Sequence, residues 1–103
     1  MKIELFGMGT PEFDWDRHNE KHLKSHRVSR QEFQQVLAND PLDLEYQTES
    51  GEERFKSLGV TNEGRPLIAV WTTREGKVRA ITAYPAGKSY EKLYRGKRRG
   101  ISE

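Results

Sequence analysis

The sequence predicts an α+β domain in which two N-terminal helices pack on a four-stranded antiparallel sheet, followed by a short C-terminal helix. Three observations indicate this fold class. Capping signals and a helical spacing of apolar residues occupy the first part of the chain. After Pro41 the pattern changes to a period of two, interrupted by turn sequences. The 103 residues suffice for one hydrophobic core, so we expect a single domain over 1–103.

The N-terminal part is expected to contain a short strand over 2–6, a loop over 7–11 and then a helix. Asp14 or Asp16 is expected to cap this helix, because a short carboxylate accepts hydrogen bonds from the unpaired amides of the first turn. The helix should end near position 27, where a second helix follows directly.

The second helix is predicted to begin at Ser29. Ser29 and Glu32 have the spacing of a capping box, in which each side chain accepts a hydrogen bond from the other residue's backbone amide. Val28, just before the cap, is expected to pack on Phe33. The sequence Asn-Asp-Pro at 39–41 is expected to end the helix. The apolar stripe of this helix comprises Phe33, Val36 and Leu37.

Four strands are predicted after the second helix, near 42–48, 53–60, 66–73 and 77–84. Short turns separate them, so consecutive strands should pair antiparallel. The third segment, PLIAVWTT, carries apolar residues on both faces, as is typical of a central strand. In the fourth, strict alternation predicts Lys77, Arg79, Ile81 and Ala83 on one face and Val78, Ala80, Thr82 and Tyr84 on the other.

The C-terminal part is predicted to form a short helix over SYEKLYR, with Tyr90, Leu93 and Tyr94 on one side, and a flexible basic tail over 95–103. The net charge is +2, but the segment from Pro85 onward carries six bases against two acids, and the remainder twelve bases against fourteen acids. A basic tail either binds a polyanion or an acidic partner, or simply solvates the chain end.

Composition excludes several kinds of chemistry. The absence of cysteine excludes disulfides, thiol nucleophiles and cysteine-ligated zinc, and is consistent with a reducing cytoplasm. There is no apolar signal segment and no apolar run of the roughly 18 residues that a membrane span needs, so we expect a soluble cytoplasmic protein. No Gly-rich phosphate loop, serine nucleophile elbow or paired acidic motif occurs.

The three histidines, His18, His22 and His26, are spaced four apart. With about 100° per helical residue, His18 falls at the margin of the apolar stripe. The inward face is expected to comprise Trp15, Asn19, His22, Leu23 and His26.

A histidine pair at i, i+4 can chelate a metal, but the His-Glu-x-x-His pattern and a third ligand cluster are missing, so we predict no metal site. The alternative for His22 is a structural hydrogen bond at a half-buried seam. His26 lies near the helix C-terminus, where the dipole favours the charged form, and an acid/base role near neutral pH is more plausible there.

Arginines on the strands form a second group of candidates. Arg54 and Arg79 lie in predicted strands and Arg74 at a turn. A guanidinium matches phosphate geometry and stabilises charge that develops on a cleaved phosphodiester, although most surface arginines only solvate a face. Trp71 can stack on a base or, in a central strand, belong to the core.

Four segments together resemble the BrnT family of type II toxin–antitoxin toxins: FDWDRHNEKHLKSHRVS, EERFKSLG, PLIAVWTT and KVRAITAYPA. The resemblance runs from Phe13 to about Tyr94 with the order and spacing of segments intact. Its most specific part is the pattern Trp15, Asp16, Asn19, His22, His26 and Val28.

The resemblance implies a RelE-like fold and a metal-independent endoribonuclease, without a cofactor, that inhibits translation. It also implies an RNA substrate and a cognate antitoxin of the BrnA type, a DNA-binding ribbon-helix-helix protein through which the toxin forms oligomers. Alternatives from other classes are a catalytically silent module that binds only the antitoxin, and a small RNA-binding domain that uses the 95–99 tail.

By position in the resemblance, His26 is the acid/base candidate, Arg54 and Arg79 are phosphate clamps and Lys24 is a supporting cation. Trp71, Arg74 and Tyr84 are expected to contact the substrate.

Two positions depart from the family pattern. Arg27 stands where the family usually has glycine, in a position suited to a positive φ, so this turn is expected to be built differently. Tyr84 stands where the family often has arginine. The alternatives are that catalysis is weakened, that the protein binds RNA or antitoxin without cutting, or that Tyr84 offsets the lost cation as a hydrogen-bond donor.

Overall fold

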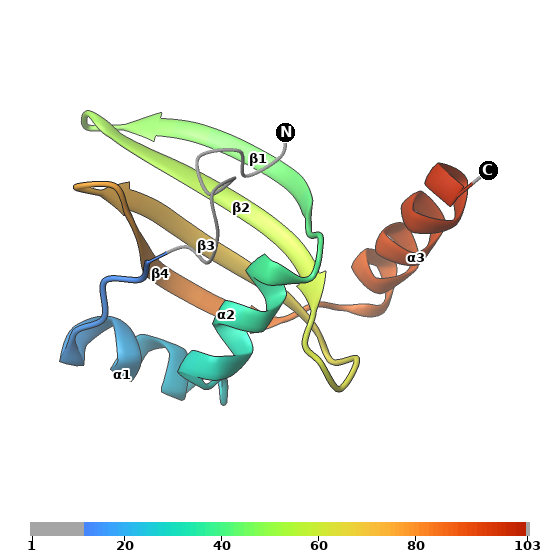
Figure 1. The fold of residues 1–103 in the computed structure, drawn as a ribbon, viewed down its shortest axis with the longest axis horizontal. Helices are drawn as coiled ribbons and strands as arrows, with labels where there is room; N and C mark the ends of the chain where they lie inside the picture. Colours follow the sequence, from blue (N-terminus) through green and yellow to red (C-terminus); the bar gives the residue numbers. More distant parts are fainter. Residues whose placement is uncertain (1–11, 103) are drawn as a thin grey trace.

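The computed structural model describes residues 12–102, except for the side chains of Glu49 and of residues 98–102. The expected strand over 2–6 and loop over 7–11 therefore lie outside the described residues. The described chain forms two helices, four strands and a third helix in sequence order (Figure 1). The elements are α1 (Arg17–Ser25), α2 (Arg30–Ala38), β1 (Leu42–Glu49), β2 (Glu52–Val60), β3 (Pro66–Arg74), β4 (Lys77–Pro85) and α3 (Lys88–Ser102).

Both N-terminal helices start where the sequence predicts. Asp16 caps α1, and its side chain accepts a hydrogen bond from the Asn19 amide at 2.8 Å. Ser29 caps α2 and forms the predicted capping box with Glu32. Asn39 is the C-cap of α2, so the prediction that the helix ends at 39–41 is confirmed. Local hydrogen bonding thus determines these boundaries.

The four strands form one antiparallel sheet in the order β1-β2-β3-β4. The turns that close the β1–β2 and β3–β4 hairpins each place two successive residues at positive φ, namely Ser50-Gly51 and Glu75-Gly76. This is the conformation of the type I′ turn, whose twist matches that of antiparallel strands. The predicted α+β class with two helices on a four-stranded antiparallel sheet is confirmed.

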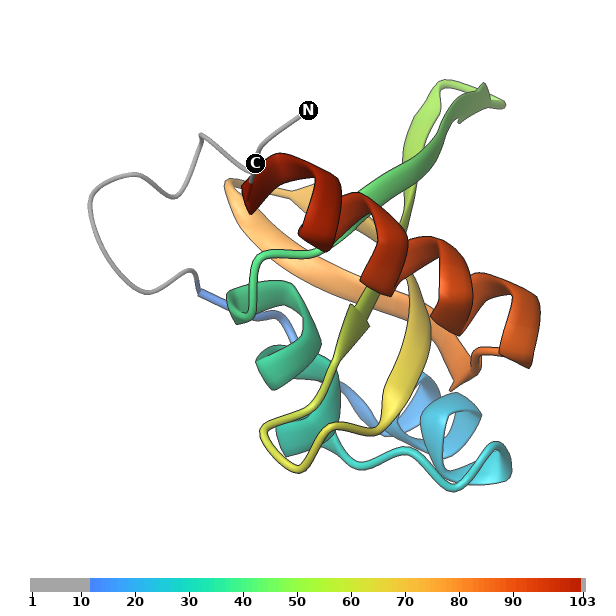
Figure 2. The same cartoon turned by 90° about the vertical axis from the view of Figure 1, so that its right-hand side faces the viewer.

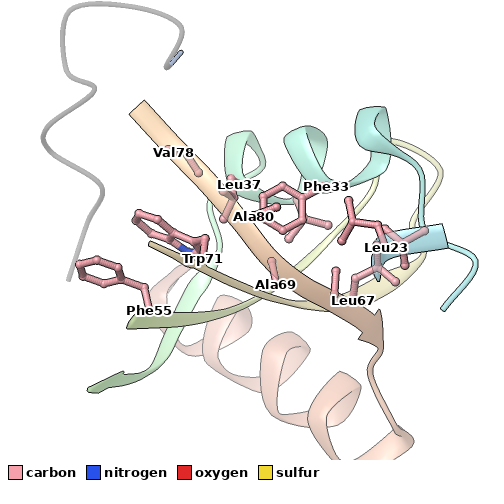
Figure 3. Close-up of a cluster of buried hydrophobic side chains, with 12 residues drawn as sticks. Leu23, Phe33, Leu37, Phe55, Leu67, Ala69, Trp71, Val78 and Ala80 are labelled. Atoms are coloured by element: carbon pink, nitrogen blue, oxygen red, sulfur yellow. The ribbon is translucent and has the colours of Figure 1, made fainter. Parts of the chain in front are cut away.

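Helices α2 and α3 cover opposite faces of the sheet. Figure 3 shows α2 on one side of the strands and α3 on the other. We call these the α2-side face and the α3-side face. The main core on the α2-side face includes Phe33, Leu67 and Trp71, and Val28 is buried in it together with Phe33 as predicted. A smaller cluster on the α3-side face comprises Leu58, Ile68 and Tyr94.

The C-terminal helix is longer than predicted. It continues through Ser102, so residues 95–102 are helical, whereas a flexible tail was expected over 95–103. In Figure 2 α3 crosses in front of the strands. Tyr94 is its one buried side chain among those described, whereas Tyr90 and Leu93 are 40% and 39% exposed. Of the described helices, none is long and apolar enough to cross a membrane.

Candidate active site

A bulge in β4 changes which side chains share a face. Val70 of β3 pairs with Thr82, but the next residue, Trp71, pairs with Ala80, so Ile81 is the extra residue of a β-bulge. The bulge reverses the alternation, and Ala83 therefore joins Val78 and Ala80 on the α2-side face. The predicted strict alternation along β4 is wrong beyond Ala80 for this reason.

The consequence of the bulge is that Tyr84 and Arg79 lie on the same face. Arg79 pairs with Thr72, and Tyr84 pairs with Ile68. Thr72 and Ile68 are an even number of residues apart in β3, and Ile68 packs against Tyr94 of α3. Cross-strand partners share a face of the sheet, so both side chains belong to the α3-side face.

Lys56 occupies the middle of this face and was not among the predicted site residues. It pairs with Val70 across the β2–β3 ladder and lies two residues from Arg54 on the same strand. Its ammonium nitrogen is 3.3 Å from a carboxylate oxygen of Glu45 on β1. The period of two between positions 54 and 56 was the sequence signal that could have identified it.

The pKa of Lys56 is raised above its ordinary value. Desolvation acts to lower this pKa, but it is outweighed by electrostatic interaction with Tyr84, by Glu45 and by Tyr90 of α3. Lys56 is therefore a protonated cation at neutral pH, with the Tyr84 phenol close enough to interact with it. Such a group can stabilise negative charge on a phosphate but cannot accept a proton.

His26 stands at the rim of the α3-side face. It is the C-cap of α1, and its ring lies 6.0 Å from the ring of Tyr84 in an edge arrangement. His22 and His18 are about one and two turns away along α1, with their rings 5.5 Å apart, and both are exposed. Of the three histidines, His26 is thus the one that the structure brings to Tyr84.

The expected inward face of α1 is only partly correct. Asn19 and Leu23 are buried, but His22 and His26 are exposed, and His22 does not lie at a half-buried seam. Asn19 is buried because it completes the α1 capping box: its side chain accepts from the Asp16 amide at 2.9 Å and donates to the Asp14 carbonyl at 3.1 Å.

Arg79 is held by two carboxylates of the segment before α1. Its Nη2 lies 2.6 Å from Asp16 Oδ2, and its Nη1 lies 3.5 Å from Asp14 Oδ2. This segment runs beside the β4 edge, where Phe13 forms a parallel bridge with Val78. The hydrogen bond to Asp16 raises the pKa of Arg79. The arginine therefore connects α1 to β4, and its charge is partly compensated within the protein.

Arg54 lies two residues before Lys56 on β2 and shares its face of the sheet, whereas Arg74 is the last residue of β3. Arg54 forms an ion pair with Glu52 at 3.2 Å. Arg74 and Arg79 both line an open groove of about 800 Å³ at the hairpin ends, together with the acidic residues Glu52 and Glu53. The groove brings two of the predicted arginines together, next to carboxylates.

Two predicted site residues lie elsewhere. Trp71 is only 1% exposed, stacks on Phe55 at 4.4 Å and donates its indole N–H to Ser57 Oγ at 3.0 Å. The prediction that Trp71 contacts the substrate by stacking on a base is therefore wrong, because its ring belongs to the core on the α2-side face. Lys24 lines a groove between α1 and α2 and is not one of the residues on the α3-side face.

The turn after α1 has the conformation that glycine would favour, although Arg27 occupies it. Arg27 has a φ of 59°. The Val28 amide donates to the Leu23 carbonyl at 3.0 Å and the Arg27 amide donates to the Lys24 carbonyl at 2.9 Å, which is the Schellman pattern. The expectation that this turn is built differently is wrong.

Comparison with known protein families gives one match. A sequence model described as "Ribonuclease toxin, BrnT, of type II toxin-antitoxin system" matches residues 15–89, well over half of the chain. The chain belongs to this BrnT family. A comparison with curated proteins finds no match.

Family membership covers every element that builds the candidate site. The matched segment starts at Trp15 and includes α1, α2 and the whole sheet, and it ends within the first turn of α3. The family consists of ribonuclease toxins, and a type II system implies a protein antitoxin as partner. Within the matched segment, Lys56, Arg79 and Tyr84 share the α3-side face with His26 at its rim, and these residues form the candidate site of this BrnT-family toxin.

Proposed function

We propose that this BrnT-family toxin is a metal-independent endoribonuclease that cuts RNA on the α3-side face and thereby inhibits translation. The observation that carries the proposal is the bulge at Ile81, which brings Tyr84 onto the face of Lys56 and Arg79, with His26 at its rim. A cation, a phenol and an imidazole from different elements then surround one surface. The antitoxin that restrains the toxin is proposed to be a BrnA-type ribbon-helix-helix protein, through which the complex forms oligomers.

The proposed reaction uses the ribose 2′-hydroxyl as nucleophile. A base removes its proton, the 2′-oxygen bonds to phosphorus, and the bond from phosphorus to the 5′-oxygen breaks as that oxygen is protonated. The products are a 2′,3′-cyclic phosphate and a 5′-hydroxyl. General acid–base catalysis contributes about 10²–10⁴-fold to such reactions, and positioned cations stabilise the pentacoordinate phosphate.

Roles follow from what each group can do. His26 is the acid/base candidate, since an imidazole side chain can both accept and donate a proton. Lys56 stabilises the phosphate, because it is a cation on the same face of the sheet as Tyr84. Arg79 is a secondary cation because Asp14 and Asp16 already share its charge. The Tyr84 hydroxyl, on the face between His26 and Lys56, is a hydrogen-bond donor to the phosphate.

The test is cleavage of RNA by the purified chain in EDTA, with the ends of the products analysed. We expect cyclic phosphate ends, growth arrest on expression, and a loss of about 10²-fold or more in His26→Ala. Lys56→Ala should lower the rate similarly. His22→Ala is the matched control, since His22 is an exposed histidine on the same helix and should leave the rate unchanged.

Failure has clear signatures. A wild-type chain that neither arrests growth nor cuts RNA in EDTA contradicts the proposal. Activity that appears only with a divalent metal contradicts metal independence, and an equal loss in His22→Ala and His26→Ala contradicts the assigned role of His26.

One observation favours a second candidate, a catalytically silent module that binds the antitoxin. Arg79 is engaged by two carboxylates, and Tyr84 stands where the resemblance implies a further arginine. A stable antitoxin complex without RNA cleavage would select this function. Tyr84→Arg would then be expected to gain activity.

A further inference from the structure

A second charged surface lies on α1 and α2, away from the proposed RNA site. Residues of α1, of α2 and of the turn that connects them line an open groove of about 770 Å³, which we call the α1–α2 groove. The apolar residues among its lining are Leu23 and Val28, which are only 1% and 3% exposed. The lining also includes four cations: Arg17, Lys21, Lys24 and Arg30.

The groove is strongly positive in a molecule whose net charge is only +2. Glu20 is the one acidic residue among those that line it, so the lining carries a charge of +3. The Glu20 carboxylate is 3.8 Å from Arg30 Nη1, and about half of each side chain is exposed. An exposed ion pair with this long separation does little to neutralise the positive charge of the groove.

Arg30 is also held in place by an aromatic ring. Its guanidinium lies 5.9 Å from the centroid of the Trp15 ring, which keeps it at the rim instead of extending into solvent. The helical backbone fixes the relative positions of Arg17, Lys21 and Lys24. The positive rim is therefore built on two helices that are both anchored to the core.

We propose that the α1–α2 groove docks an acidic segment of the partner antitoxin. A lining with four cations and a single carboxylate is electrostatically complementary to a peptide segment that offers several carboxylates. Single-stranded RNA is less well suited, because it is bound through stacking on aromatic rings and none of the described lining residues is aromatic. The inference rests on the pairing with an antitoxin and not on RNA cleavage.

The position of the groove gives the interaction a specific consequence. The groove lies between α1 and α2, whereas Lys56 and Tyr84 lie on the α3-side face of the sheet. An antitoxin segment in this groove holds the toxin without occupying the surface that contacts RNA. Antitoxin affinity and RNA cleavage should therefore be separable by mutation.

The experiment compares charge-reversed variants of the full chain for binding to the antitoxin encoded beside it. R17E/K21E changes two exposed cations four residues apart on α1. K88E/K92E changes two exposed lysines with the same spacing on α3 and is the matched control. R17Q/K21Q removes charge without adding repulsion. Affinity is measured by titration at several salt concentrations, and folding is checked by thermal melting.

We expect R17E/K21E to weaken antitoxin binding by about tenfold or more and to reduce its salt dependence, with a smaller loss in R17Q/K21Q. The control should stay within about twofold, and RNA cleavage by R17E/K21E should be unchanged. Should the first variant fold poorly, R17Q/K21Q provides the comparison.

Three results would overturn the inference. Unchanged affinity in both α1 variants shows that the groove does not contact the antitoxin. Equal losses in R17E/K21E and K88E/K92E show general electrostatic attraction without a docking site. Loss of RNA binding with unchanged antitoxin affinity shows that the groove is an RNA surface. Absence of any RNA cleavage would contradict the proposed function while leaving this test valid.

Discussion

Arg27 holds a backbone conformation that is unfavourable for any residue with a Cβ atom. Its φ of 59° places it in the left-handed region, which costs about 1 kcal/mol for such residues. The turn persists because the surrounding structure fixes it: Arg65 Nη1 donates to the Arg27 carbonyl at 2.8 Å and also binds the Glu32 carboxylate at 2.9 Å. The strain at this residue is offset by the joint between the two helices.

We predict that Arg27→Gly increases the free energy of unfolding by about 0.5 to 1 kcal/mol, because glycine adopts this φ without steric conflict. Urea denaturation should show a higher midpoint with an unchanged slope. Arg27→Ala is the control, since it removes the same side chain but keeps the Cβ atom. If both variants gain equally, the long side chain and not the backbone is the source of strain.

Asp16 uses its two carboxylate oxygens for two different purposes. Oδ1 accepts the Asn19 amide at the start of α1, and Oδ2 accepts Arg79 of β4. The hydrogen bond from the Asn19 backbone and that from Arg79 lower the pKa of Asp16. A carboxylate with a lowered pKa stabilises the folded state above its unfolded pKa, and this contribution is lost as the pH falls through the folded value.

We predict that Asp16→Asn melts at a lower temperature than the wild type at neutral pH. The difference should shrink as the pH falls below about 3.9, the ordinary value for Asp, because the wild-type carboxylate then becomes neutral too. Asparagine still caps α1, so the variant isolates the charge. Asp14→Asn should have a smaller effect, since Asp14 lies 3.5 Å from Arg79. A pH-independent difference would contradict this account.

At the scale of elements, local sequence signals predict the helices and turns, but the bulge in β4 depends on how this strand pairs with β3. The capping residues Asp16 and Ser29 act within one helical turn, so the sequence alone located both helix starts. The bulge at Ile81 is set by how β4 pairs with β3 and packs under the helices. No sequence pattern within residues 77–84 indicates the bulge, so the prediction of which side chains share a face was wrong beyond Ala80.

The C-terminal helix is attached to the rest of the molecule mainly through Tyr94. Its ring packs with Leu58 and Ile68, and its hydroxyl donates to the Asn39 carbonyl at 3.2 Å. Burial raises the pKa of this phenol. Lys92 and Arg95 are exposed on the same helix, which makes local opening of α3 detectable with trypsin.

We predict that Tyr94→Ala increases the rate of tryptic cleavage within α3 by about tenfold or more, because the loss of this contact favours local opening. Tyr94→Phe should retain most of the protection, since the ring supplies the burial. Leu93→Ala is the control, as Leu93 is 39% exposed. Equal cleavage of the wild type and Tyr94→Ala would show that other contacts hold α3.

At the scale of the whole molecule, the sheet separates two charged surfaces. The α3-side face carries the proposed catalytic groups, and the α1–α2 groove lies on the two N-terminal helices. His26, at the C-cap of α1, reaches the rim of the first surface, while Arg17 and Lys21 of the same helix line the second. One helix thus contributes to both proposed surfaces from different sides.

We predict that the two activities separate. His26→Ala should lose RNA cleavage and bind the antitoxin with wild-type affinity, whereas R17E/K21E should cut RNA normally and escape neutralisation by the antitoxin. Growth curves with and without antitoxin expression, together with cleavage assays, measure both. A loss of both activities in each variant, with intact folding, would indicate a single shared surface.

The sequence by itself determined the α+β class, both capped helices, the order of the four strands and, through the resemblance, the family. These depend on hydrogen bonds and periodicities that span a few residues. Tertiary structure alone decided that Tyr84 shares a face with Arg79, that Trp71 is core and that Lys24 lines the groove between α1 and α2. The reason is physical: a single bulge reverses every side chain beyond it, and only the pairing of β3 with β4 fixes where it occurs.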